Sequence, residues 1–206
     1  MDVTWLNGPI KSSQASKLLT MSRLQWDTAI KLPPGYQLRL ACHQDLSQLV
    51  ELLLRSFYPE NRLNRVLYPV MRLGIQEDIK RRIKGSLHQY ACLVIVNTSE
   101  NAATIVGTVE MSLRSNFWQP LAPRRPYIAN VAVDYRHRRC GLAQQMLLAC
   151  EAISQTWGLR QIYLHVATDN PSALALYHKA GYQIVGQSRP WQRRQMMLKE
   201  LFSEIK

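Results

Sequence analysis

Apolar residues recur from residue 36 to residue 201 with the two periods that distinguish strands from helices. Alternating or continuously apolar runs predict the following strands: Tyr36–Ala41, Tyr90–Val96, Thr104–Leu113, Tyr127–Val133, Gln161–Thr168, Tyr182–Gly186 and Gln195–Leu201. Apolar positions three and four apart predict helices in the following places: Leu46–Phe57, the basic segment 62–88, Leu142–Trp157 and the stretch after Pro171. Strands and helices alternate within one domain and without a repeat, which favours an α/β or α+β fold with a mixed sheet.

Residues typical of helix ends flank three of these helices. Asp45 stands where it can cap the N-terminus of the first helix, and Asn170 precedes Pro171 at the start of the last. Gly158 and Gly181 each follow the last apolar position of a helix, as a C-terminal capping glycine does.

Two segments lie outside this pattern. Residues 1–34 alternate serines with basic residues and end in Pro33 and Pro34, which Gly35 follows, so we interpret them as an N-terminal extension to a domain spanning residues 35–206. The segment Ser115–Pro126 contains three prolines and Trp118, and it is long enough to be a functional loop that helps to choose the substrate.

The chain is strongly basic, with 26 lysines and arginines against 14 acidic residues, a net charge of +12. This excess favours an anionic partner such as nucleic acid, anionic lipid or a phosphate-bearing cofactor. We do not expect nucleic acid, because the basic stretches lack interleaved aromatic residues, a helix-turn-helix signature and zinc ligands. The longest uncharged apolar run, Tyr90–Val96, is far shorter than the roughly 20 residues of a membrane-spanning helix. We interpret the basic segment 62–84 as a solvated helix face.

Four cysteines are spread along the chain at Cys42, Cys92, Cys140 and Cys150. Their spacing has neither the paired CxxC motifs of a zinc site nor the density of a disulfide scaffold. We therefore expect no metal site and a reducing, cytoplasmic compartment.

The most informative motif lies between the apolar strand Tyr127–Val133 and the helix that follows it. Its sequence is Arg138-Arg139-Cys140-Gly141-Leu142-Ala143. The free N–H groups of a helix start, its positive dipole end and nearby arginines together make an anion-binding site, and we expect a diphosphate group as its ligand. Taken alone, this motif is better explained as an ordinary polar turn, and Cys140 in it is better explained as a small filler than as a nucleophile.

A second motif follows the next strand. Asn170, Ala173 and Tyr177 have a spacing that places them on one face of a helix, and Gly181-Tyr182 comes soon after. A capping asparagine and a core tyrosine would explain this motif separately. The two motifs occur in the order strand, helix start, strand, helix within about sixty residues. This combination favours the interpretation that both belong to one functional site.

Together these motifs resemble the core of the GNAT superfamily of acyl-CoA N-acyltransferases. The resemblance covers roughly residues 36–201 and is sharp across 127–187. It implies a single GNAT-like domain with a mixed, mostly antiparallel central sheet flanked by helices. The strand Tyr127–Val133 and the segment Tyr163–Val166 also resemble plastid and cyanobacterial members, some of which are similar to enzymes that acetylate both lysines and protein N-termini.

The resemblance implies acetyl-CoA as co-substrate and assigns roles to particular residues. Backbone groups of the last strand residues would bind the thioester and pantetheine, backbone amides and arginines of the turn would hold the pyrophosphate, and Asn170 would bind the pantetheine arm. The cofactor-binding residues are accordingly Val131, Ala132, Val133, Arg138, Arg139, Cys140, Gly141, Leu142, Ala143, Gln144 and Asn170. Ala143 stands where the family more often has glycine. Tyr177 would protonate the departing thiolate.

An attacking amine is mostly protonated at pH 7 and must lose a proton to a base before it can attack a thioester. Glu110, the one acid in the strand Thr104–Leu113, is the candidate base, because family members often carry a carboxylate on the equivalent strand. A solvent-facing strand glutamate is an equally good explanation of this residue. His165 is a weaker candidate, and His137 is more readily assigned to solvent or cofactor phosphate.

The leading hypothesis is an N-acetyltransferase that transfers the acetyl group directly to a primary amine in a ternary complex, with protein lysines or N-termini as acceptors. A small-molecule amine acetyltransferase, for a polyamine, arylalkylamine or aminoglycoside, is the alternative enzyme. A basic nucleic-acid-binding protein and a catalytically inactive acetyl-CoA sensor are the alternatives from other classes, and Tyr177 argues against the sensor.

Overall fold

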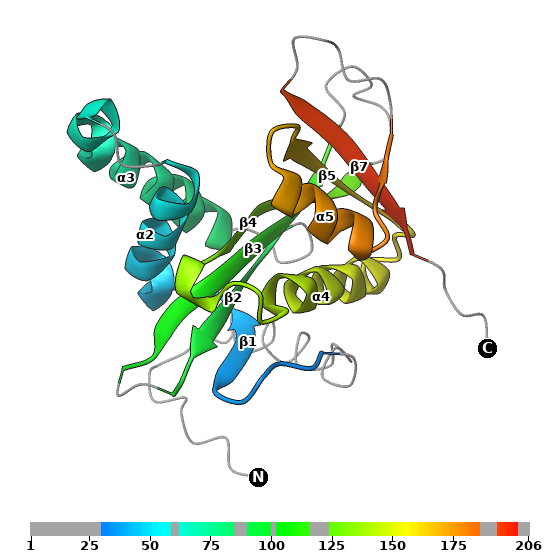
Figure 1. Ribbon diagram of the computed structural model, residues 1–206, viewed down its shortest axis with the longest axis horizontal. Coiled ribbons are helices and arrows are strands. Elements are labelled where there is room, and N and C mark those ends of the chain that lie inside the picture. The colour runs from blue at the N-terminus through cyan, green and yellow to red at the C-terminus, as the bar shows by residue number, and fades with distance from the viewer. Residues whose placement is uncertain are drawn as a thin grey trace.

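The computed structural model describes residues 30–58, 62–84, 90–99, 102–115, 124–185 and 193–201, without the side chains of 62–66. Seven strands form one sheet in the order β1-β2-β3-β4-β5-β7-β6 (Figure 1). Their bounds are β1 Tyr36–Leu40, β2 Tyr90–Asn97, β3 Thr104–Arg114, β4 Arg125–Val133, β5 Gln161–Ala167, β6 Gln183–Ile184 and β7 Arg194–Glu200. Neighbouring strands are antiparallel except for β4 and β5, which confirms the mixed, mostly antiparallel sheet.

Helices cover both faces of this sheet. The bounds are α2 Leu46–Phe57, α3 Arg62–Ile83, α4 Leu142–Thr156 and α5 Pro171–Lys179. Figure 1 shows α2 and α3 together on one side and α4 and α5 together on the other. Alternate side chains of β2 divide between an apolar cluster with α4 and a second cluster with α2 and α3. Among the described residues, no helix is both long and apolar enough to cross a membrane.

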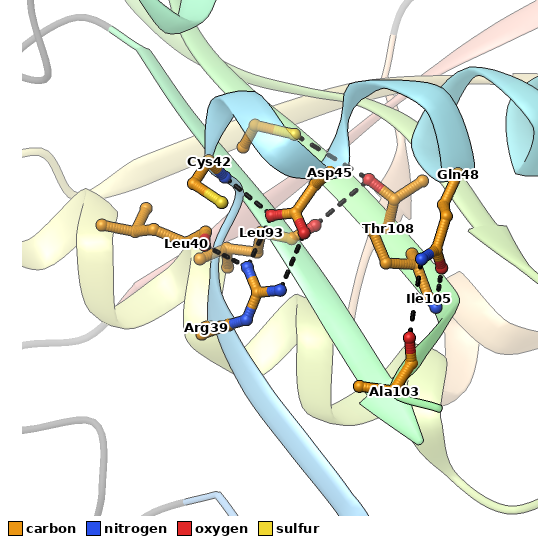
Figure 2. A network of polar contacts seen from close by, with 10 residues as sticks. Arg39, Leu40, Cys42, Asp45, Gln48, Leu93, Ala103, Ile105 and Thr108 are labelled. Atoms are coloured by element: carbon orange, nitrogen blue, oxygen red, sulfur yellow. Dashed lines mark hydrogen bonds and ion pairs between the residues drawn. The ribbon is translucent and has the colours of Figure 1, made fainter. Parts of the chain in front are cut away.

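Asp45 fastens the start of α2 to the edge of the sheet in a way that the sequence does not reveal (Figure 2). It ends a short 3₁₀ helix, His43–Asp45, and makes no side-chain cap to α2. Its carboxylate instead accepts two hydrogen bonds from the Arg39 guanidinium, at 2.5 and 2.8 Å, and one from the Cys42 N–H at 2.7 Å. Burial opposes ionisation, but these bonds prevail and lower the pKa of Asp45.

A second contact in Figure 2 ties α2 to β3. The Gln48 side chain accepts a hydrogen bond from the Ile105 N–H at 2.8 Å and donates one to the Ala103 carbonyl at 3.5 Å. This contact and the Asp45 contact hold α2 across the sheet, next to the strand that carries Glu110.

The element boundaries differ from expectation in a few places. Strand β4 begins at Arg125, so the end of the expected loop is part of the sheet, with Arg125 opposite Arg114. Trp118 and most of the 1–34 extension lie outside the described residues, although Ile30 and Leu32 pack against the α4 cluster. The domain boundary itself stays a prediction.

Candidate active site

Strands β4 and β5 part in the middle of the sheet. Although they are parallel neighbours, they pair only at Tyr127 with Tyr163 and at Ile128 with Leu164. Beyond these pairs, β4 runs on to Val133 and β5 to Ala167 without pairing with each other. Backbone groups along the two facing edges are therefore available to another extended molecule.

Asn130 shapes the β4 edge of this opening. The pairing of β4 with β3 shifts register around it, and Asn130 has a positive φ of 52°. After this bulge, Ala132 pairs with Thr108, and the Asp134 N–H donates to the Val106 carbonyl at 2.8 Å. Since backbone groups alternate direction along a strand, those of Val131 and Val133 point toward the opening.

Ala132 is placed differently from its two neighbours. Its backbone faces β3, and its buried side chain belongs to the α2 cluster. Its predicted part in cofactor binding is therefore limited to spacing Val131 and Val133.

A row of unpaired N–H groups lies at the start of α4, just beyond the end of β4. The N–H groups from Arg139 to Gln144 donate no hydrogen bond to another described residue, and the first helical bond joins the Gln145 N–H to the Gly141 carbonyl at 3.2 Å. Arg139 and Gly141 have left-handed backbones, with φ of 66° and 77°. Strained, left-handed residues beside free N–H groups are typical of anion-binding turns.

The predicted turn residues divide by exposure. Leu142 is buried in the α4 cluster, so only its backbone faces the turn, whereas Ala143 and Gln144 are half-buried. The Cys140 thiol is exposed and donates weakly to the Arg138 carbonyl at 3.6 Å.

Side chains from three segments fix the turn in place. Arg138 donates from Nε to the Val133 carbonyl at 3.1 Å, which joins the turn to the end of β4. The His137 ring nitrogen Nδ1 and the Tyr36 hydroxyl are 2.8 Å apart, and the Lys31 N–H donates to the Gln145 side chain at 2.8 Å. These contacts from the N-terminal side of the domain have no local sequence signal and were not predicted.

Asn170 and Tyr177 lie on α5, on the other side of the opening. The Asn170 side-chain oxygen caps α5 by accepting from the Ala173 N–H at 3.0 Å, which leaves its amide group exposed. Tyr177 is 7% exposed, and its ring contacts that of Tyr182 edge-on. Burial, reinforced by the nearby Tyr127 and Cys150, raises the pKa of Tyr177 to about 12.

Glu110 is buried at 2% exposure rather than solvent-facing. It forms an ion pair with Arg82 of α3 and accepts a hydrogen bond from the Asn130 side chain at 2.7 Å. Arg82 also pairs with Asp78 one turn earlier. The basic segment of α3 is therefore not solvated throughout, because Arg82 reaches the site.

His165 of β5 stands beside the same opening, where its Nδ1 atom lies 2.9 Å from the Tyr127 hydroxyl. Burial and the charges of Arg194 and Arg114 lower the pKa of His165 below its ordinary value. Within the part of the chain that the structure describes, no group of three or more histidine, cysteine or acidic side chains is arranged to hold a metal ion.

Comparison with known proteins identifies relatives by sequence. The chain is 38% identical to GCN5-related N-acetyltransferase 4, chloroplastic, and 28% identical to GCN5-related N-acetyltransferase 10, chloroplastic, both from Arabidopsis thaliana. These matches cover 74% and 56% of the chain and 62% and 50% of the relatives, so the chain spans little more than half of their length.

A solved structure shares the fold. The PaiA N-acetyltransferase of Thermoplasma acidophilum, determined in complex with coenzyme A, superposes with a TM-score of 0.64 at 17% identity, over 80% of this chain and 98% of that one. The model of the acetyltransferase (GNAT) family matches residues 47–182, which include the sheet opening, the α4 turn and α5. The chain belongs to the acetyltransferase (GNAT) family.

Proposed function

We propose that the protein is an acetyl-CoA-dependent N-acetyltransferase that acetylates protein amines, at lysine side chains, N-termini or both. One observation carries this proposal: the free N–H groups from Arg139 to Gln144 lie at the same end of β4 at which β4 and β5 have parted. A ligand with a diphosphate group and an extended, amide-bearing arm would use both features at once.

The residues present fit acetyl-CoA. The α4 N–H groups and the exposed Arg139 would hold the diphosphate. The backbone of Val131 and the N–H of Val133 would bind the pantetheine arm as a neighbouring strand would. The exposed amide of Asn170 would bind the same arm from α5. The Arg138 guanidinium already donates to Val133, so it would complete the turn and add its charge beside the phosphates.

Glu110 lies where an acceptor amine needs a base. It is opposite Ala129 in the β3–β4 pairing, one residue beyond the last β4–β5 pair. Arg82 and Asn130 keep this carboxylate oriented. Glu110 would then take the proton of the ammonium group through a bridging water.

Tyr177 supplies the proton at the other end of the transfer. With a pKa of about 12, the phenol is protonated at every pH at which the enzyme would work. As the amine nitrogen bonds to the acetyl carbon and the C–S bond breaks, the Tyr177 proton would pass to the departing thiolate, and the second proton that the nitrogen releases would return to Tyr177 through water.

Protein amines are the proposed acceptors because the site strands resemble plastid family members, some of which are similar to enzymes that acetylate lysines and protein N-termini, and the two Arabidopsis thaliana relatives are named as chloroplastic. A polyamine or other small amine remains the alternative acceptor.

We propose a reducing compartment as well. None of the described cysteines forms a disulfide, and Cys92 and Cys150 are fully buried thiols. The cytoplasm is the predicted compartment, and the chloroplast, which the relatives' names give, is the second candidate. Imaging of the tagged full-length protein separates the two.

The test combines a product assay with a matched pair of tyrosine variants. The protein is incubated with acetyl-CoA and a peptide library, and acetylated lysines and N-termini are identified by mass spectrometry. Tyr177→Phe should lower kcat by on the order of 10²–10⁴ with little change in acetyl-CoA affinity. Tyr182→Phe removes a neighbouring buried hydroxyl that has no hydrogen-bond partner among the described residues, and it should keep its activity. Equal activity in the two variants would return Tyr177 to a packing role.

A further inference from the structure

The acceptor amine can approach the parted strands from one face of the sheet. The α4 side is filled by the apolar cluster that includes Ile128, Leu164 and Tyr177. On the opposite side, α2 and α3 lie over β2, β3 and part of β4, as Figure 1 shows. The face formed by β4, β5 and β7 on that side carries exposed polar residues. Glu110 of the neighbouring strand β3 lies on the same side of the sheet.

Strand register places three arginines on this face. Pairing aligns Glu110 with Ala129, Arg114 with Arg125, and Tyr127 with Tyr163, so these side chains share one side of the sheet. The pairing of β5 with β7 adds His165 and, opposite Ala167, Arg194. We call Arg114, Arg125 and Arg194 the arginine face.

Aromatic rings hold two of these arginines. The Arg114 guanidinium lies 3.9 Å from the centre of the Tyr127 ring, and that of Arg125 lies 5.2 Å from the centre of the Tyr163 ring. The Tyr127 ring is itself fixed by the hydrogen bond of its hydroxyl with His165. A guanidinium stacked in this way keeps its N–H edge free to bind a carboxylate.

The charge of the arginine face is not neutralised by ion pairs within the part of the domain that the structure describes. No carboxylate of the described residues lies within ion-pair distance of Arg114, Arg125 or Arg194, although seven such pairs form elsewhere among those residues. Glu110, the nearest acid by strand register, is already paired with Arg82. Burial lowers the pKa of His165, and the nearby charges of Arg194 and Arg114 lower it further.

We infer that the arginine face selects acceptors with acidic residues next to the reacting amine and disfavours polycations such as spermidine and lysine-rich peptides. This inference rests on the proposed N-acetyltransferase activity and names the chemical class of its acceptor. The guanidinium N–H edges attract the carboxylates of an acidic acceptor, and the positive charges of the same arginines repel an approaching polycation.

The test uses three peptides of equal length with a free N-terminal amine, followed by acidic, neutral or basic residues, together with spermidine. We expect kcat/KM for the acidic peptide to exceed that for the basic one by about tenfold, from roughly threefold for each of two arginines that a short peptide engages. The ratio should shrink as salt is raised, because exposed charges are screened over about 8 Å at physiological ionic strength.

Variants assign the preference to the arginine face. Replacement of all three arginines by glutamine should bring the acidic-to-basic ratio close to one. Lys179→Gln, which removes a positive charge from exposed α5, should leave the ratio as in the wild type. Thermal midpoints show whether each variant is folded, and single substitutions replace the triple variant if it is not.

The outcomes separate the two proposals. Acetylation of all three peptides at equal kcat/KM, or a ratio unchanged in the arginine variants, would overturn the charge selection and leave the transferase activity standing. Preferential acetylation of spermidine would overturn the charge selection and favour a small-amine enzyme. Acetyl-CoA binding without acetylation of any acceptor would remove the proposed function and this inference with it.

Discussion

Two glycines at opposite ends of α4 allow the cofactor assignment to be tested against backbone strain. Gly141 has φ of 77° and Gly158 has φ of 72°, and a Cβ added at either would meet nothing within 4 Å. Gly141→Ala and Gly158→Ala should therefore carry the same penalty, about 1–2 kcal/mol from the left-handed backbone alone. For a domain of this size, each variant should lose about 2–8 °C in thermal midpoint without ligand.

The thermal midpoints of the two variants should differ once acetyl-CoA is added. A ligand at 100 times its Kd stabilises the folded state by about 2.7 kcal/mol. A methyl group at Gly141 limits the approach of diphosphate oxygens to the surrounding N–H groups, and one charge-assisted hydrogen bond is worth about 1.5–3 kcal/mol. The Kd of Gly141→Ala should then rise at least tenfold, which removes about 1.4 kcal/mol of the stabilisation.

Thermal unfolding with and without acetyl-CoA measures both effects in one experiment, and calorimetric titration supplies the Kd. The Gly158→Ala variant should shift with acetyl-CoA as the wild type does, whereas the shift of Gly141→Ala should be smaller by about 3–6 °C. Equal ligand shifts in the two variants would show that the α4 turn does not hold the diphosphate.

Three further predictions concern the ionisable groups around the site. Arg82→Gln should cost about 3–5 kcal/mol in urea unfolding because it leaves the buried Glu110 without its ion-pair partner. Glu110→Gln should cost clearly less because Arg82 keeps its pair with Asp78, and equal losses would contradict this asymmetry. Asp45→Asn should destabilise the protein at neutral pH and flatten its acid unfolding curve. The lowered pKa of Asp45 makes its contribution complete above the ordinary value near 3.8 and lost as the pH falls through the folded value. The rate should show no alkaline decline near pH 10, since the pKa of Tyr177 is about 12 rather than that of a free phenol, and a decline at pH 10 in a pH–rate profile would argue against Tyr177 as the acid.

The parts of the site that could be predicted have strong local signals. Gly141 at a strand-to-helix turn and Asn170 before Pro171 each specify backbone geometry within a few residues, and the structure places both at helix starts. The apolar patterns likewise predicted the central strands within a few residues at each end. Local periodicity sufficed there because burial on both faces requires continuous apolar runs.

The parts that escaped prediction depend on residues distant in the sequence. The burial of Glu110 follows from Arg82, 28 residues earlier, and no spacing rule joins a helix end to a strand in this way. The bulge at Asn130 interrupts an apolar run that contains no glycine to mark it. Asp45 has the position of a helix cap, yet it bonds to Arg39 because the 3₁₀ turn directs its side chain toward β1.

The positive charge of the proposed arginine face would also change the pKa of the acceptor amine. Cations near an ammonium group disfavour its charged form, so the proposed arginine face would lower the pKa of an amine bound beside Glu110. A less basic amine gives up its proton more readily to the Glu110 carboxylate, which Arg82 and Asn130 hold in place. Acidic residues in the acceptor would then bind the arginines while the amine itself, held at the parted strands, becomes neutral and able to attack.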